Sequence, residues 1–198
     1  MIFYTGDLHL GHEGIIGIDG RPFEDAGEMD ETLIRKWNQK VSDTDDVYII
    51  GDLFGRETDD PGGCLDRLKG RKHLVIGNHD GRLVQKKGVI SRFESVGSIM
   101  QIRDCKRSVV LCHYPIIMWN RMEFGSLHVF GHIHNRKPDM ICKWMKSQKT
   151  AFNAGCMING YEPVSLEELE TNNLEWLEDG GTEPDVQDNS VKIMKFAE

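Results

Sequence analysis

The sequence predicts an α/β fold, and three observations support this prediction. Five apolar runs of β-type composition each end at a cluster of polar residues. Helical patterns lie between the first three runs, which gives the alternation of strand and helix typical of α/β proteins. The second half of the chain is richer in strand-like runs. The five runs are MIFYTGD (1–7), DDVYIIGD (45–52), KHLVIGNHD (72–80), SVVLCHYP (108–115) and SLHVFGHIH (126–134).

Two helices are predicted between the first three strands. The first covers 28–41, because its apolar residues recur at the spacing of one helix face, and it starts near Asp25 or Gly27. That face consists of Met29, Leu33, Ile34, Trp37 and Val41. The second helix is short, covers 64–70 and is closed by Gly70.

The later part of the chain adds shorter elements. They are a hairpin over 98–112 that turns near 104–106, a hairpin over 140–145, a strand over 150–156 and a helix over 165–170. Ser165 is suited to cap that last helix, since acidic residues follow it in the first turn. From Asn172 onward the composition is acidic and contains a Gly-Gly pair, which predicts a loop or a loosely docked tail.

Length and charge indicate one domain with an acidic end. The 198 residues are enough for one sizeable core. The net charge of −8 comes from the C-terminal part, because ten of the 32 acidic residues but only two of the 24 basic ones lie from Ser165 onward. We therefore expect a single domain over 1–164, with a helix and an acidic tail over 165–198 docked on it.

Composition also bears on partners and location. No apolar run reaches the length of a membrane helix, and the first residues resemble a strand rather than a signal peptide. Five scattered cysteines without a CxxC pair suggest reduced thiols, which favours a cytoplasmic location. Residues 1–164 are formally neutral, which argues against binding long nucleic acids and suits a small anionic substrate beside bound cations. The sequence leaves the oligomeric state open.

Polar residues at the predicted strand ends form the candidate site. Ligands of α/β proteins bind beyond the carboxyl ends of strands, and five of the eight histidines lie there. The set is Asp7, His9, Asp52, Asn78, His79, His113, His132 and His134. Imidazole, carboxylate and amide donors suit Mn, Fe or Zn, and seven such donors are too many for one tetrahedral ion. They are about right for two ions that share a carboxylate.

The motifs DLH, GD, GNHD, H and GHIH, in that order, resemble those of the calcineurin-like metallophosphoesterase superfamily. The resemblance spans residues 1 to about 155. The opening DLHLGH, the RPF at 21–23 and a helix ending WNQKV are similar to a group of small single-domain bacterial and phage phosphoesterases. This resemblance implies an α/β sandwich of two packed mixed β-sheets flanked by helices.

The resemblance also implies a role for each residue of the set. Asp7, His9 and His134 correspond to the ligands of one metal ion, and Asn78, His113 and His132 to those of a second. Asp52 corresponds to the carboxylate that bridges both ions, His79 to the catalytic histidine, and Asp80 to the acid that supports His79. The chain departs from many relatives at Gly55, where they have a second aspartate. That departure argues against closeness to the protein Ser/Thr phosphatases and leaves metal binding unaffected.

The implied chemistry is two-metal hydrolysis of phosphate esters, either mono- or diesters, by a hydroxide held between the ions, with His79 at the leaving oxygen. Two alternatives stay open: a nuclease of the same superfamily, and a non-catalytic metal-binding scaffold. A nuclease of this kind usually carries a basic DNA-gripping surface, and a scaffold typically loses a ligand or the catalytic histidine. This sequence has no strongly basic region of that kind, and all seven candidate ligands and His79 are present.

Three further residues are candidates for contact with substrate. His12 could reach the substrate, or could form a hydrogen bond within its loop. Arg21 could clamp a phosphate, or could lie in a surface turn before Pro22. Arg56 is close to a predicted metal loop and could touch substrate. The bulky stretch 114–124 after His113 could wall the pocket or pack in the core.

Overall fold

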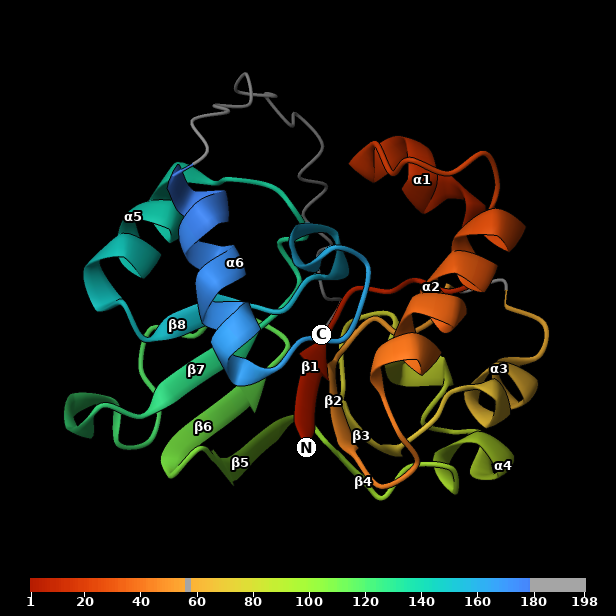
Figure 1. Cartoon of the computed structure of the whole chain (residues 1–198), viewed down its shortest axis with the longest axis horizontal. Helices are drawn as coiled ribbons and strands as arrows, with labels where there is room; N and C mark the ends of the chain where they lie inside the picture. The colour runs from red at the N-terminus through yellow and green to blue at the C-terminus, as the bar shows by residue number, and fades with distance from the viewer. Residues whose placement is uncertain (56–57, 179–198) are drawn as a thin grey trace, which may run out of the picture.

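A computed structural model describes residues 1–55 and 58–178 of the chain (Figure 1). Two four-stranded sheets face each other at the centre of the molecule, with helices on their outer sides. This is the predicted α/β class with two packed sheets. Arg56 lies outside the described residues, and so does the part of the predicted tail over 179–198.

The first sheet is parallel throughout and has the order β1-β2-β3-β4. Its strands are β1 Ile2–Thr5, β2 Asp46–Ile50, β3 Arg71–Val75 and β4 Ser95–Gly97. Because all four strands run the same way, the loops that follow them emerge at one edge of the sheet.

The second sheet is mixed and has the order β5-β6-β7-β8. Its strands are β5 Ile99–Asp104, β6 Arg107–Cys112, β7 Leu127–Phe130 and β8 Ala151–Asn153. The predicted hairpin is present, since β5 pairs antiparallel with β6 and the turn residues Cys105 and Lys106 have positive φ. β6, β7 and β8 are parallel, so the ends of β6 and β7 also lie together.

The helices cover the outer sides of the two sheets (Figure 1). They are α1 Glu13–Asp19, α2 Ala26–Lys40, α3 Pro61–Arg67, α4 Lys87–Ile90, α5 Asp139–Gln148 and α6 Leu166–Glu178. α1 to α4 lie beside the first sheet, and α5 and α6 beside the second. No helix in the described ranges is long and apolar enough to cross a membrane.

Alternating side chains of the first sheet build two layers of core. Phe3, Ile49 and Leu74 belong to the cluster under α1 to α4. Their chain neighbours Ile50 and Val75 point the other way and pack with the second sheet. A third cluster joins the second sheet to α5 and the end of α6. The predicted apolar face of α2 lies in the first cluster, and Val41 directly after the helix is also buried there.

Several elements differ from the prediction. Residues 140–145 belong to helix α5, not to a hairpin. α3 begins three residues before the predicted start, with Pro61 in its first turn, and ends before Gly70. The segment from Asn172 to Glu178 continues α6, whose start is capped as predicted: Ser165 and Glu168 bond to each other's backbone or side chain. α6 buries Leu166 and Leu169 against the sheets.

Candidate metal centre

Five loops bring the candidate site residues together at the carboxyl ends of strands from both sheets. Asp7 and His9 follow β1, Asp52 follows β2, and Asn78 and His79 follow β3. His113 follows β6 directly, and His132 and His134 follow β7. Sequence reasoning therefore identified the edge at which these side chains meet.

The first group of possible metal ligands consists of Asp7, His9, Asp52 and His134, whose donor atoms lie within 4.8 Å of one another. His9 Nε2 lies 3.3 Å from His134 Nε2 and 3.7 Å from Asp52 Oδ2. His134 Nε2 lies 3.9 Å from Asp7 Oδ1. Two imidazole nitrogens and two carboxylates thus face a common point.

The second group consists of Asp52, His113 and His132. His113 Nε2 lies 3.5 Å from Asp52 Oδ2. Asn78 joins this group through its Oδ1, which is 3.0 Å from both His113 Nε2 and His132 Nδ1. Asp52 belongs to both groups, which is the arrangement that a shared carboxylate requires.

The backbone at these ligands is unusual. Asp7, His9 and Asp52 have φ between 50° and 53°, and His132 and His134 have φ of 72° and 52°. Side chains other than glycine rarely adopt this left-handed region, which costs on the order of 1 kcal/mol or more per residue. Strand geometry does not aim Asp7 and His9, because β1 ends at Thr5. Left-handed turns beyond the strand aim both side chains instead.

Two glycines make room for the ligands. A Cβ at Gly51, whose φ is 80°, would lie 2.8 Å from Gly77 Cα and would overlap the His113 ring. A Cβ at Gly77 would overlap the Asp52 carboxylate and lie 2.6 Å from the Asp52 nitrogen. The space that these glycines leave is therefore taken by neighbouring ligand residues.

Burial tunes the protonation of the first group. Asp7 and His9 are each 1% exposed. Burial raises the pKa of Asp7 to about 6, because the ionised carboxylate loses its water. Burial, followed by the nearby His134, lowers the pKa of His9 to about 2, so its imidazole is neutral at pH 7. A neutral imidazole beside buried carboxylates is ready to bind a cation.

Asp19 is a residue of this site that sequence reasoning missed. Its carboxylate accepts a hydrogen bond from His134 Nδ1, with distances of 2.7 and 2.9 Å to its two oxygens. This bond turns the Nε2 atom of His134 toward the ligand group. Burial is the largest single effect on His134 and lowers its pKa, but the hydrogen bond to Asp19 and the charges of Asp7 and Asp19 together raise it. Asp19 ends α1, which no sequence pattern had predicted.

Arg21 has neither of its two expected roles, since it is buried and lies under the site. Its Nη1 donates to the carbonyl of Leu8 and its Nη2 to that of Asp7, both at 2.8 Å. Its Nη2 also pairs with Asp19 at 3.1 Å. Arg21 thus connects the backbone of the first ligand loop to the carboxylate that orients His134.

Asp80 has partners other than the one expected. Its Oδ2 accepts from the backbone nitrogens of Asp52 and Gly77, at 2.9 and 2.8 Å, and its Oδ1 accepts from Leu53 at 3.1 Å. It therefore holds two ligand loops together rather than supporting the His79 side chain. The His79 nitrogen donates to Asp52 Oδ1 at 2.8 Å, and the buried Nδ1 atom of its ring has no hydrogen-bond partner among the described residues.

His12 lies beside the first group. Its ring centroid is 5.5 Å from that of His9 and 6.4 Å from that of His79. Gly55 is the position of the missing second aspartate, and a Cβ there would lie 2.6 Å from His12 Cβ. The glycine therefore leaves room for His12. Whether His12 contacts substrate stays a prediction.

The two histidines that were left out of the candidate set do lie elsewhere. His73 bonds to Ser95 and Asp46 at the start of the first sheet. His128 is fully buried and bonds to the backbone of Val110 and Ile116.

The donor set fits metal binding. Asp7 and Asp52 are buried, and no described Lys or Arg forms an ion pair with either carboxylate, since Arg21 contacts only the carbonyl of Asp7. Buried charges are usually paired or coordinate metals, so a cation would satisfy both carboxylates. The two packed sheets flanked by helices match the architecture that the resemblance implied, although the first sheet is parallel and not mixed. The implied ligand residues lie together at the strand ends.

Comparison with known proteins gives relatives of similar length. An uncharacterised protein of Methanocaldococcus jannaschii is 28% identical over 168 residues, covering 84% of this chain and 87% of the relative. The gene 66 protein of Mycobacterium phage L5 is 29% identical over 163 residues, covering 67% and 77%. No family model matches the chain.

Among solved structures, a protein of unknown function from Aquifex aeolicus has a TM-score of 0.67 and 24% identity, and the match covers 86% of this chain and 98% of that one. The two proteins share a fold. A phosphoesterase from E. coli, YfcE, matches at a TM-score of 0.41 and 15% identity over 78% of this chain and 77% of that one. That likeness is too low to carry an argument about activity.

Proposed function

We propose that this protein is a metal-dependent phosphoesterase with a dinuclear centre. The observation that supports it most directly is the position of Asp52, which is a member of both groups of possible metal ligands. Two adjacent cations require a ligand that both can share, and a carboxylate placed between two sets of imidazoles can serve as that ligand.

In this proposal Asp7, His9, Asp52 and His134 hold one ion, and Asp52, Asn78, His113 and His132 hold the other. When bound, the ions supply Lewis acidity toward water and the phosphoryl oxygens. The identity of the metal, Mn, Fe or Zn, depends on affinity order and on availability as well as on this mixed nitrogen and oxygen donor set.

Other residues of the chain would position the metal ligands and supply a proton to the leaving group. The Asp19 carboxylate and the Arg21 guanidinium fix the direction of His134 and the path of the first ligand loop. The backbone nitrogen of His79 donates a hydrogen bond to the Asp52 carboxylate, which keeps the His79 imidazole close to the proposed reacting centre. In the proposed reaction His79 donates a proton to the leaving oxygen.

The substrate is proposed to be a small phosphorylated molecule, because residues 1–164 have no net charge with which to hold a long nucleic acid. A cytoplasmic location and an oligomeric assembly also stay proposals.

A matrix of metals and substrates tests the activity. The purified chain is loaded with Mn, Fe or Zn and assayed on p-nitrophenyl phosphate, bis-p-nitrophenyl phosphate, nucleotides and cyclic nucleotides. We expect hydrolysis of at least one ester with at least one metal, and its loss in an Asp52→Asn variant. The control is His128→Gln, which changes a buried histidine outside the site. Bound metal without hydrolysis of any ester would favour the non-catalytic scaffold.

A further inference from the structure

A basic cleft lies at the other end of the second sheet from the metal centre. It has a volume of about 720 Å³ and is open to solvent along β5, the start of β6 and the loop before β7. Sequence reasoning gave these residues no role beyond the hairpin and the bulky stretch after His113. The cleft is large enough for a ligand of nucleotide size.

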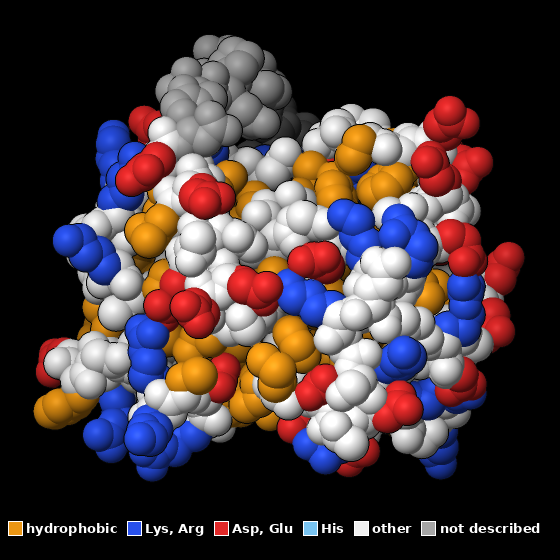
Figure 2. Space-filling model, in the orientation of Figure 1, with side chains coloured by type: hydrophobic (Ala, Val, Ile, Leu, Met, Phe, Trp, Pro, Cys, Tyr) orange, Lys and Arg blue, Asp and Glu red, His pale blue; other side chains and the backbone are white. Residues whose placement is uncertain are grey.

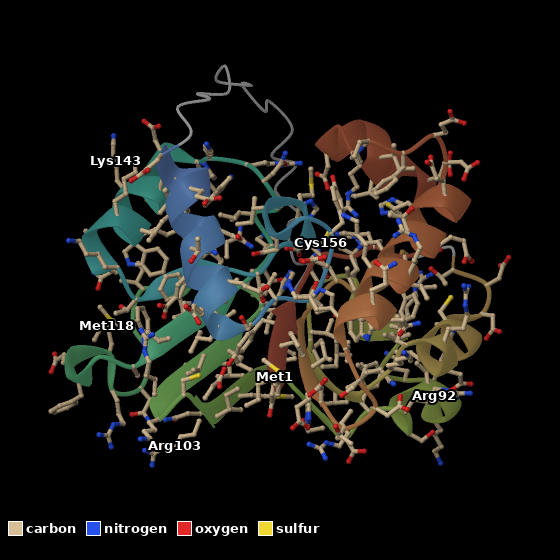
Figure 3. All side chains as sticks on the ribbon, in the orientation of Figure 1. Met1, Arg92, Arg103, Met118, Lys143 and Cys156 are labelled. Carbon is tan, nitrogen blue, oxygen red and sulfur yellow. The ribbon has the colours of Figure 1, made fainter. Side chains whose placement is uncertain are left out.

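Positive charge dominates the lining of this cleft. Four of its ten lining residues are basic, namely Arg103, Lys106, Arg107 and Arg121, and none is acidic. Arg107 is paired with Glu170. No carboxylate of residues 1–55 or 58–178 forms an ion pair with the other three, all of which are exposed. Lys and Arg side chains gather over this part of the molecule in Figure 2, at the lower left, where Figure 3 labels Arg103.

An aromatic ring lies beside these charges. Phe124 is 80% exposed although it is apolar, and the Arg121 guanidinium lies 5.8 Å from the centre of its ring. Polar groups complete the lining: Gln101 Nε2 donates to Ser108 Oγ at 2.8 Å. Exposed rings next to arginines are how proteins stack nucleic-acid bases while contacting phosphates.

The cleft is separate from the candidate metal centre. Its residues precede or begin β6 and β7, whereas His113 and His132 follow the same strands. A strand of six residues spans roughly 20 Å, so the two sites lie at opposite ends of the second sheet.

We infer that this cleft is a second binding site, for a nucleotide whose phosphates contact Arg103, Lys106 and Arg121 and whose base stacks on Phe124. Guanidinium groups bind phosphate oxygens through paired, charge-assisted hydrogen bonds. The inference does not depend on the proposed hydrolysis, because no cleft residue belongs to the metal centre.

The test measures binding of ADP and of pyrophosphate to the full chain by calorimetry, as purified and again with EDTA. We expect ADP to bind in both conditions and more tightly than pyrophosphate. Arg103→Glu combined with Arg121→Glu is expected to weaken ADP binding about tenfold or more. Phe124→Ala is expected to weaken ADP binding and to leave pyrophosphate binding unchanged.

A double variant with the same charge change is the control. Lys87→Glu with Lys143→Glu reverses two exposed charges away from the cleft, and ADP binding should stay within about twofold. Equal losses of ADP affinity in both double variants would overturn the inference, because they would show that ADP is attracted only by the net charge of the protein. ADP bound no more tightly than pyrophosphate would also overturn it. Thermal unfolding verifies that each variant is folded. If the Arg103→Glu, Arg121→Glu double variant does not fold, the single variant Lys106→Glu replaces it in the binding test.

Discussion

The carboxylate of Asp19 lies 2.7 Å from His134 Nδ1, across 115 residues of sequence, and fixes the orientation of one candidate ligand. Partners of this kind typically contribute a factor of 10 to 100 to metal affinity. We expect Asp19→Asn to weaken the binding of the first ion by that factor, measured by competition with a chelator. Asp139→Asn, at an exposed position of α5, is the control. Unchanged affinity with an intact fold would mean that packing alone orients His134.

Arg21 should contribute mainly to stability. Removing one partner of a buried ion pair typically costs about 3 to 5 kcal/mol, because the other charge is left unpaired. We therefore expect Arg21→Met to lower the free energy of unfolding by that amount in denaturant titrations. The double variant with Asp19→Asn should lose less than the sum of the two single variants. Additive losses would show that the two side chains do not stabilise each other.

Asp52 and Asp7 should differ in their effect on metal content. Asp52 belongs to both ligand groups and Asp7 to one. We expect Asp52→Asn to reduce binding of both ions, and Asp7→Asn to reduce mainly the first. Metal-to-protein ratios from plasma mass spectrometry separate these outcomes. Equal ratios in the two variants would argue against a shared carboxylate.

His79 should affect turnover rather than metal content. Its backbone nitrogen contacts Asp52, while its side chain belongs to neither ligand group. We expect His79→Ala to lower turnover by on the order of 10², as is typical when a general acid is removed, with the metal retained. His73→Ala, at the far end of β3, is the matched control. Loss of metal from the His79 variant would identify this residue as a ligand instead.

Asp7 should make the metal-free protein sensitive to pH. Its pKa of about 6 in the folded chain exceeds the unfolded value of about 4, so protonation favours folding. Its stabilising contribution is complete below pH 4 and falls by about 3 kcal/mol as the pH rises through 6. With EDTA, Asp7→Asn should therefore be more stable than the parent at pH 7.5 and equal to it near pH 4. Melting temperatures at several pH values test this, and a difference that does not vary with pH would contradict it.

The sequence predicted the loops of the site well, because each ligand follows a short apolar run of β-type composition. The carboxyl ends of parallel strands in one sheet lie at the same edge, so Asp7 and Asp52 could be placed together from the sequence. His132 follows a strand of the second sheet, and its place beside them was implied by the resemblance. The left-handed turns that aim these side chains could not be predicted, because Asp and His are uncommon in that conformation.

Long-range partners were beyond the reach of local patterns. α1 has the sequence EGIIGID, in which three β-branched residues and two glycines disfavour a helix, so Asp19 at its end had no assigned element. Arg21 next to Pro22 resembled a surface turn, and only its bonds to the carbonyls of Asp7 and Leu8 account for its burial. α5 was taken for a hairpin because Ile141, Trp144 and their neighbours also suit strands.

The candidate ligands are divided between the two sheets: Asp7, His9, Asp52 and Asn78 come from the N-terminal half, and His113, His132 and His134 from the C-terminal half. If the chain were cut in the short link between β4 and β5, each fragment would carry an incomplete coordination sphere. Association of the two separately synthesised fragments would then depend on cation concentration, because the ions would be bound by ligands from both fragments.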